Sequence, residues 1–180
     1  MIYIALLRGV NVGGKRKLPM PELRAALADA GFERVSTYIN SGNIIFTSEN
    51  PDARALEGRI VRLISDKFAL EVPTLVISAA ELAAALTHAP DWWGDDPEAK
   101  HNAIFVLPPA TAEDVCATVG EIKPEYERMA YHGQVIYWSA PRATFSHTRW
   151  SKVVGTSAYA SVTIRNADTA RKLAALTRED

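Results

Sequence analysis

Apolar residues in the first half of the chain follow two alternating patterns. Short runs rich in β-branched and aromatic residues, typical of strands, alternate with segments in which apolar residues recur every three or four positions, as in an amphipathic helix. The turn sequence Asn40-Ser41-Gly42-Asn43 indicates a β-hairpin, because glycine and asparagine tolerate a positive φ. The predicted strands are Ile2–Leu7, Val35–Ile39, Ile44–Thr47 and Pro73–Ile77, and the predicted helices are 20–30, 51–68 and 79–86.

The second half of the chain repeats this order of elements. Its predicted strands are Ala103–Leu107, Tyr126–Tyr131, Gln134–Trp138 and Ser161–Arg165, and its predicted helices begin at Thr111, near Trp150 and after the cap Asn166. The repeated order predicts an α+β fold, a tandem duplication of ferredoxin-like βαββαβ units, each followed by a short helix. We expect a first half over residues 1–88, a joining segment over 89–102 and a second half over 103–180.

Composition places the chain among ordinary globular proteins and excludes several classes. The 180 residues are 48% hydrophobic and 23% charged, with a net charge of -1. A single cysteine, Cys116, excludes an intrachain disulfide framework, and the four histidines show no metal-ligand spacing, so we expect neither a metal nor a cofactor. No apolar run reaches the roughly 18 residues that span a bilayer, and the N-terminus lacks the charge order of a signal peptide. We therefore expect a cytoplasmic protein that does not associate with membranes.

A glycine-rich basic segment follows the first predicted strand. Gly9–Lys15 matches the spacing of a phosphate-binding P-loop, but Arg16 stands where that motif needs a Ser or Thr to hold magnesium. The segment instead suits an anion without a metal, since glycine backbone N–H groups and nearby cations both favour negative charge. A flexible basic loop whose glycines serve only a turn is the alternative.

The predicted topology brings this segment beside the first hairpin turn. In a ferredoxin-like unit the first two strands run parallel with the third between them, so the loop and the turn share one edge of the sheet. Basic residues near the C-terminus, interleaved with aromatic ones, add a pattern typical of single-stranded nucleic-acid contacts. The candidate ligand-binding residues are Arg8, Asn11, Gly13, Gly14, Lys15, Arg16, Asn40, Ser41, Asn43 and Arg165.

Three stretches of sequence resemble signatures of the bacterial domain-of-unknown-function family 1697. They are Ala5–Lys15 (ALLRGVNVGGK), Thr37–Phe46 (TYINSGNIIF) and Thr163–Leu173 (TIRNADTARKL). In the last signature a Trp commonly follows the asparagine, whereas Ala167 follows Asn166 here. The resemblance implies a duplicated α/β fold in a family without an assigned activity, and it supplies no catalytic residues.

Two functions of different classes are consistent with these patterns. We favour a noncatalytic module that binds an anionic ligand, a nucleotide or single-stranded nucleic acid, through the glycine-rich basic segment. The alternative is an enzyme that acts on a phosphorylated or carboxylated small molecule at the same edge. A third hypothesis is that the segment serves only folding or self-association.

Overall fold

The apolar run at the N-terminus forms a central strand of a four-stranded antiparallel sheet. This strand, β1 (Ile2–Leu7), pairs with β3 (Asn43–Thr47) on one side and with β4 (Thr74–Ser78) on the other, and β2 (Glu33–Tyr38) lies at the edge beside β3. The strand order is β2-β3-β1-β4. Because β1 and β2 both run antiparallel to β3, they run parallel to each other and end at the same edge, as the sequence predicts.

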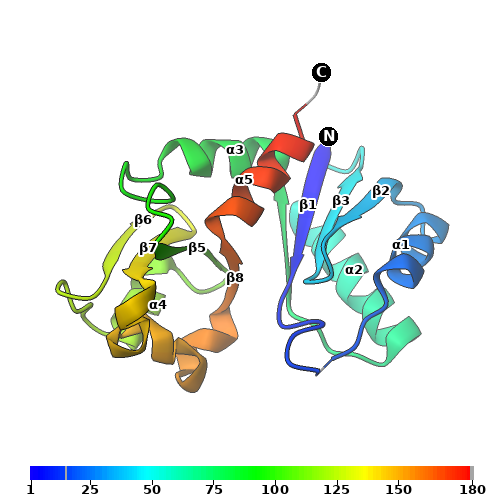
Figure 1. Ribbon diagram of the computed structural model, residues 1–180. Helices are drawn as coiled ribbons and strands as arrows, with labels where there is room; N and C mark the ends of the chain where they lie inside the picture. The colour runs from blue at the N-terminus through cyan, green and yellow to red at the C-terminus, as the bar shows by residue number, and fades with distance from the viewer. Residues whose placement is uncertain (15, 179–180) are drawn as a thin grey trace. The chain divides into compact units, whose positions relative to one another are not determined.

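Two helices cover one face of this sheet. Figure 1 shows α1 (Met20–Asp29) and α2 (Ala53–Phe68) on the same side of the strands, where alternate residues of β1 point toward them. The helix α2 begins after Asp52, whose carboxylate accepts a hydrogen bond from the Ala55 N–H at 3.0 Å. The core between the layers contains Tyr3, Ala5, Leu7, Leu23, Leu27, Phe46, Leu56, Ile60 and Ile64.

A second four-stranded antiparallel sheet has the equivalent strand order, β6-β7-β5-β8. Its strands are β5 (Ala99–Val106), β6 (Arg128–His132), β7 (Val135–Pro141) and β8 (Val162–Asn166). The strand β5 begins four residues before the predicted one, because Lys100, His101 and Asn102 are polar and interrupt the apolar pattern although they pair with β7. The α+β class and both antiparallel sheets that the sequence predicts are therefore present.

Short helices complete the second sheet. The helix α4 (Ala112–Val119) begins with the predicted capping box, in which Thr111 and Asp114 each accept a hydrogen bond from the other's backbone N–H. Three 3₁₀ helices, η1 (Arg142–His147), η2 (Trp150–Gly155) and η3 (Ser157–Ser161), occupy the connection from β7 to β8. They pack Trp150, Val153 and Ala158 against Ile104 and Trp138 of the sheet.

A buried carboxylate holds the start of η2. Glu127 accepts hydrogen bonds from the Trp138 indole and from the backbone N–H groups of Arg149, Trp150 and Lys123. These donors offset the cost of removing the charge from water. Glu127 therefore joins β7 to the segment that enters η2.

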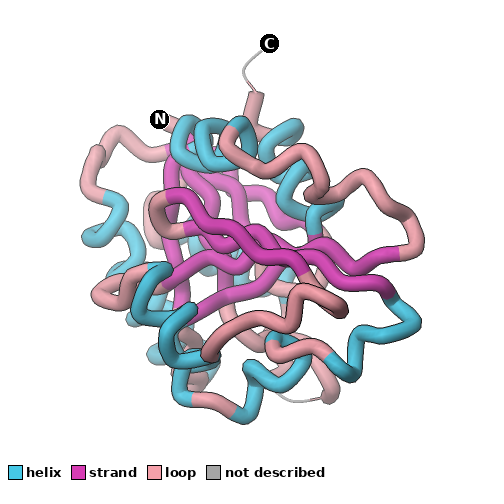
Figure 2. Tube along the Cα trace, turned by 90° about the vertical axis from the view of Figure 1, so that its left-hand side faces the viewer, coloured by secondary structure: helices cyan, strands magenta, loops and turns pink. Residues whose placement is uncertain are grey.

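The computed structural model describes residues 1–14 and 16–178, which form two compact units. The first unit comprises Met1–Ala83 and the segment that starts at Leu173, and the second comprises Ala84–Lys172. Both unit boundaries fall inside helices, α3 (Ala79–Thr87) and α5 (Ala167–Leu176). Figure 2 distinguishes the strands of the two sheets, in magenta, from the helices, in cyan. Within the described residues, no helix has both the length and the apolar character needed to cross a membrane.

Candidate functional site

The described residues of the glycine-rich segment after β1 form a small hairpin, here called the finger and defined as residues 11–14 and 16–18. The Asn11 N–H donates to the Arg16 carbonyl at 3.1 Å, and Gly13 and Gly14 at the tip have φ angles of 61° and 74°. Two successive residues with positive φ are what a tight type I′ hairpin turn requires. The helix α1 starts only at Met20, so the finger is not followed directly by a helix. This distinguishes the finger from a P-loop, in which the loop leads straight into a helix.

Asn11 fastens the base of the finger. Its Oδ1 accepts a hydrogen bond from the Leu18 N–H, and its Nδ2 donates to the carbonyls of Leu18 and Asn40, each at 2.8 Å. The last of these bonds joins the finger to the turn between β2 and β3. The loop and the turn therefore share an edge, as the sequence predicts, and the amide of Asn11 is the group that connects them.

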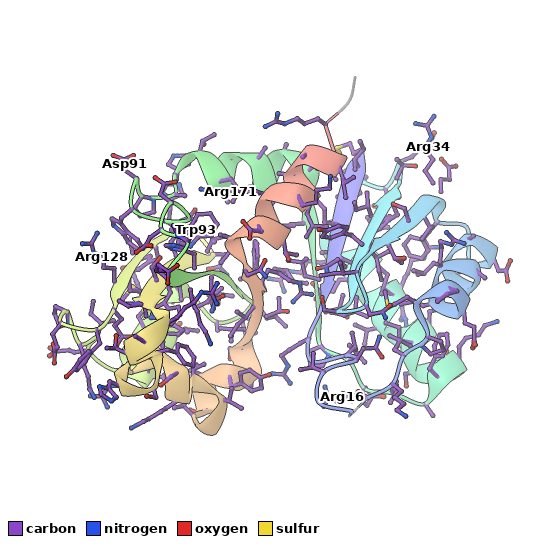
Figure 3. All side chains as sticks on the ribbon, in the orientation of Figure 1. Arg16, Arg34, Asp91, Trp93, Arg128 and Arg171 are labelled. Carbon is purple, nitrogen blue, oxygen red and sulfur yellow. The ribbon has the colours of Figure 1, made fainter. Side chains whose placement is uncertain are left out.

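The finger presents its glycine tip and two of its cations to solvent. Gly13, Gly14, Arg16 and Lys17 are all exposed, and Figure 3 shows Arg16 near the end of the loop that follows β1. Val12 beside the tip is 60% exposed. The predicted site residue Lys15 lies outside the described residues, and Arg8 at the end of β1 is half-buried. Neither segment 8–19 nor segment 38–43 contains an acidic residue, a histidine or a cysteine.

Polar side chains of the turn between β2 and β3 form hydrogen bonds within the turn. Asn43 is completely buried, and its Nδ2 donates to the Tyr38 carbonyl at 3.0 Å and to the Ser41 Oγ at 3.3 Å. Gly42 has a φ of 82°, and a Cβ there would lie 2.6 Å from a methyl group of Val10. Asn40 is exposed and contributes its backbone carbonyl to Asn11. The side chains of Ser41 and Asn43 thus have intramolecular partners in the turn.

Arg165, the remaining predicted residue, lies on β8 in the second unit. Its side chain is buried, and its Nη1 donates to the Thr163 Oγ1 at 2.9 Å and to the Ile164 carbonyl at 2.8 Å. Burial lowers the pKa of Arg165 to about 10. It belongs to a different unit from the finger.

Sequence reasoning missed a histidine and serine pair in the second unit. His101 on β5 lies opposite Ser139 on β7, and its Nδ1 is 2.5 Å from the Ser139 Oγ. The other ring nitrogen, Nε2, is 2.8 Å from the Asp96 carbonyl oxygen. The two residues are far apart in sequence and meet only through strand register, so no spacing pattern signals the pair.

Comparisons with known proteins agree with the resemblance found in the sequence. Among solved structures, the conserved bacterial protein SP0830 from Streptococcus pneumoniae is similar to this chain, with 32% identity, a TM-score of 0.86 and 98% of each chain covered. No curated protein matches the sequence. The profile of the family described as "Protein of unknown function (DUF1697)" matches residues 1–137. The chain therefore belongs to the DUF1697 family.

Proposed function

We propose that the finger is a noncatalytic module that binds an anionic ligand. Asn11 holds the base of this hairpin in place. The hairpin presents the exposed cations Arg16 and Lys17 and the exposed glycines of its tip. A fixed base reduces the conformational entropy that binding would otherwise cost. The absence of acidic residues from segments 8–19 and 38–43 leaves the local charge positive.

The observation that carries this proposal is the contrast between the two sheets. The connection from β1 to α1 spans residues 8–19, whereas the equivalent connection from β5 to α4 spans only 107–111. Both sheets nevertheless reach equivalent strand orders. Because the shorter connection suffices for the second sheet, the additional length, glycines and cations of the first favour a role in binding over a role in folding alone.

We also infer that the two sheets are duplicated ferredoxin-like units. The supporting observations are the equivalent strand orders and the position of a hairpin between the second and third strands of each sheet. In the second unit, the 3₁₀ helices η1, η2 and η3 replace the long helix α2 of the first. On this interpretation the finger is an addition to one copy of a repeated scaffold.

The exposed finger suits single-stranded nucleic acid better than a free nucleotide. Small-molecule sites are concave and enclose most of the ligand, whereas Gly13, Gly14 and Arg16 are all exposed. Among the described residues, none accepts a hydrogen bond from the backbone N–H of Gly13 or Gly14, so both donors are available to phosphate oxygens. Exposed Val12 and Ile39 offer apolar contact to bases.

The test compares two variants that remove the same charge from the same unit. Arg16→Gln with Lys17→Gln should weaken binding of a fluorescent single-stranded RNA by roughly tenfold or more, because phosphate contacts are lost. The slope of log affinity against log salt should fall by about one unit for each lost contact. The control, Arg62→Gln with Lys67→Gln, neutralises two exposed residues of α2 and should retain the affinity.

Other outcomes distinguish the alternatives. Unchanged RNA affinity in the finger variant, or equal losses in both variants, would reject the finger as the binding site. Saturable binding of a mononucleotide with no preference for the RNA would identify a nucleotide as the ligand. Turnover of a phosphorylated or carboxylated small molecule that depends on Arg16 and Lys17 would support the alternative enzyme.

A further inference from the structure

The side chains of His101 and Ser139 lie on the face of the second sheet opposite its 3₁₀ helices. Neighbouring residues Ile104 and Trp138 point into the core on the other face, and side chains alternate along a strand. The sheet register places His101 directly across from Ser139, so two rigid strands hold the imidazole and the hydroxyl together. The His101 Nδ1 and the Ser139 Oγ lie within hydrogen-bond distance of each other.

The Asp96 carbonyl determines which nitrogen of His101 carries the proton in the neutral ring. A carbonyl oxygen only accepts hydrogen bonds, so the Nε2 atom 2.8 Å away must carry the hydrogen. Nδ1 is then unprotonated and accepts the hydrogen bond that the Ser139 hydroxyl donates. A base that faces a hydroxyl and is oriented by a third group is the arrangement that activates serine nucleophiles.

The pair lines a cavity of about 280 Å³ in the second unit. Trp92 and Tyr126 contribute aromatic surface to this cavity, and Arg128 contributes a cation. Arg128 on β6 lies opposite Ser139 in the sheet register, and Figure 3 shows it on that edge strand. The carboxylate of Glu127, which also lines the cavity, is already engaged by backbone and indole N–H groups.

We propose that Ser139 and His101 are the nucleophile and base of a hydrolytic site for small acyl esters. The Ser139 Oγ forms a bond to the acyl carbon while its proton passes to the His101 Nδ1. The bond between the acyl carbon and the alcohol oxygen then breaks, and the proton on His101 moves to that oxygen as the alcohol leaves. Water next attacks the acyl carbon, one of its protons passes through His101 to the Ser139 Oγ, and the carboxylic acid departs.

Arg128 supplies the positive charge that this reaction needs. Negative charge develops on the carbonyl oxygen of the ester as the serine attacks, and a nearby cation stabilises it. Among the described residues that line the cavity, Arg128 is the one with a guanidinium or ammonium group. Its place opposite Ser139 therefore assigns it to the oxyanion.

A covalent probe tests the nucleophile directly. A fluorophosphonate should modify the intact protein at Ser139, as located by peptide mass spectrometry, and the protein should hydrolyse p-nitrophenyl acetate. Both rates should fall about 100-fold or more in Ser139→Ala and His101→Gln, the scale of general-base catalysis. Ser146→Ala and His132→Gln change exposed residues of the same unit and should retain both rates. Failure of the folded wild-type protein to acquire the label at Ser139 would overturn the proposal.

A second variant covers the case in which Ser139→Ala does not fold. In Ser139→Cys, the new thiol should react with iodoacetamide at least tenfold faster than Cys116, because His101 draws the thiol proton away. Adding His101→Gln should remove that advantage. Equal reactivity of the two thiols, or an advantage that survives without His101, would show that position 139 is not activated and would also overturn the proposal.

Discussion

Asparagine side chains determine the local structure around the finger. Asn11 and Asn43 both direct their amide groups at backbone or side-chain partners within the same edge of the sheet. The sequence correctly placed the loop that contains Asn11 beside the turn that contains Asn43. It does not distinguish an exposed asparagine that binds a ligand from one whose amide is buried in a turn. Burial of Asn43 follows from its place as the first residue of β3, which no local pattern specifies.

Asn43→Asp should therefore act on stability. A carboxylate cannot donate to the Tyr38 carbonyl, and it places a charge where no water reaches. The free energy of unfolding should fall by about 2–4 kcal/mol in urea titrations. The exposed Asn40→Asp should stay within about 0.5 kcal/mol of wild type. An Asn43→Asp protein as stable as wild type would contradict the buried donor role.

Tyr137 should make the protein less stable in alkali. Its hydroxyl donates to the Ala85 carbonyl, and burial raises its pKa from 10.0 to about 12. The folded state therefore keeps a proton that the unfolded state loses, so the free energy of unfolding falls as pH rises from about 10 to about 12. Tyr137→Phe should be less stable than wild type at pH 8, and the difference should shrink across this window.

Urea titrations between pH 8 and pH 12 measure this effect. Tyr126→Phe is the matched control, since it removes a phenol hydroxyl from the same unit. A constant difference between Tyr137→Phe and wild type across the window would show that the Tyr137 phenol titrates alike in both states.

At the scale of elements, the sequence predicted the strands and hairpins better than the connections. The alternation of apolar and polar residues and the turn residues were enough to predict the strands of both sheets, because these signals lie within short stretches of sequence. The long connection from β7 to β8 forms three 3₁₀ helices, and Glu127 holds the start of the second. No periodic pattern marks a carboxylate that accepts distant backbone N–H groups. The pair His101 and Ser139 was missed for the same reason, since register is set by the whole sheet.

The residue directly after β2 is unsuited to its backbone conformation. Ile39 has a φ of 49°, which is costly for a β-branched side chain, and it is 50% exposed. Ile39→Asn should raise the free energy of unfolding by about 1 kcal/mol, because asparagine adopts this conformation more readily. Ile39→Val keeps the branching and should give no gain. Thermal and urea unfolding of the two variants would decide, and a loss of stability in Ile39→Asn would mean that packing of Ile39 outweighs its strain.

At the scale of the molecule, the first unit is discontinuous in sequence. The segment from Leu173 clusters with residues 1–83 although the second unit lies between them in the chain. Leu173 is completely buried, whereas Leu176 in the same helix is 47% exposed. The cap and the apolar spacing in the sequence predicted helix α5. They do not indicate that its two ends belong to different units, because that depends on tertiary packing.

Leu173→Ala should weaken the first unit selectively. Removing a buried leucine side chain costs about 2–5 kcal/mol. Hydrogen exchange should accelerate at the amides of β1 and β3 more than at those of the hairpin β6–β7. Leu176→Ala is the control and should leave exchange near wild type. Acceleration confined to β6 and β7 would show that Leu173 supports the second unit instead.

The split first unit has a consequence for the protein as it is being made. Domains generally fold as they emerge from the ribosome, the N-terminal one first. Here the strands and helices of residues 1–83 leave the ribosome early, but the segment that completes their unit is translated only after the whole second unit. Of the two units, the one whose synthesis begins earlier is therefore the one that receives its final segment later.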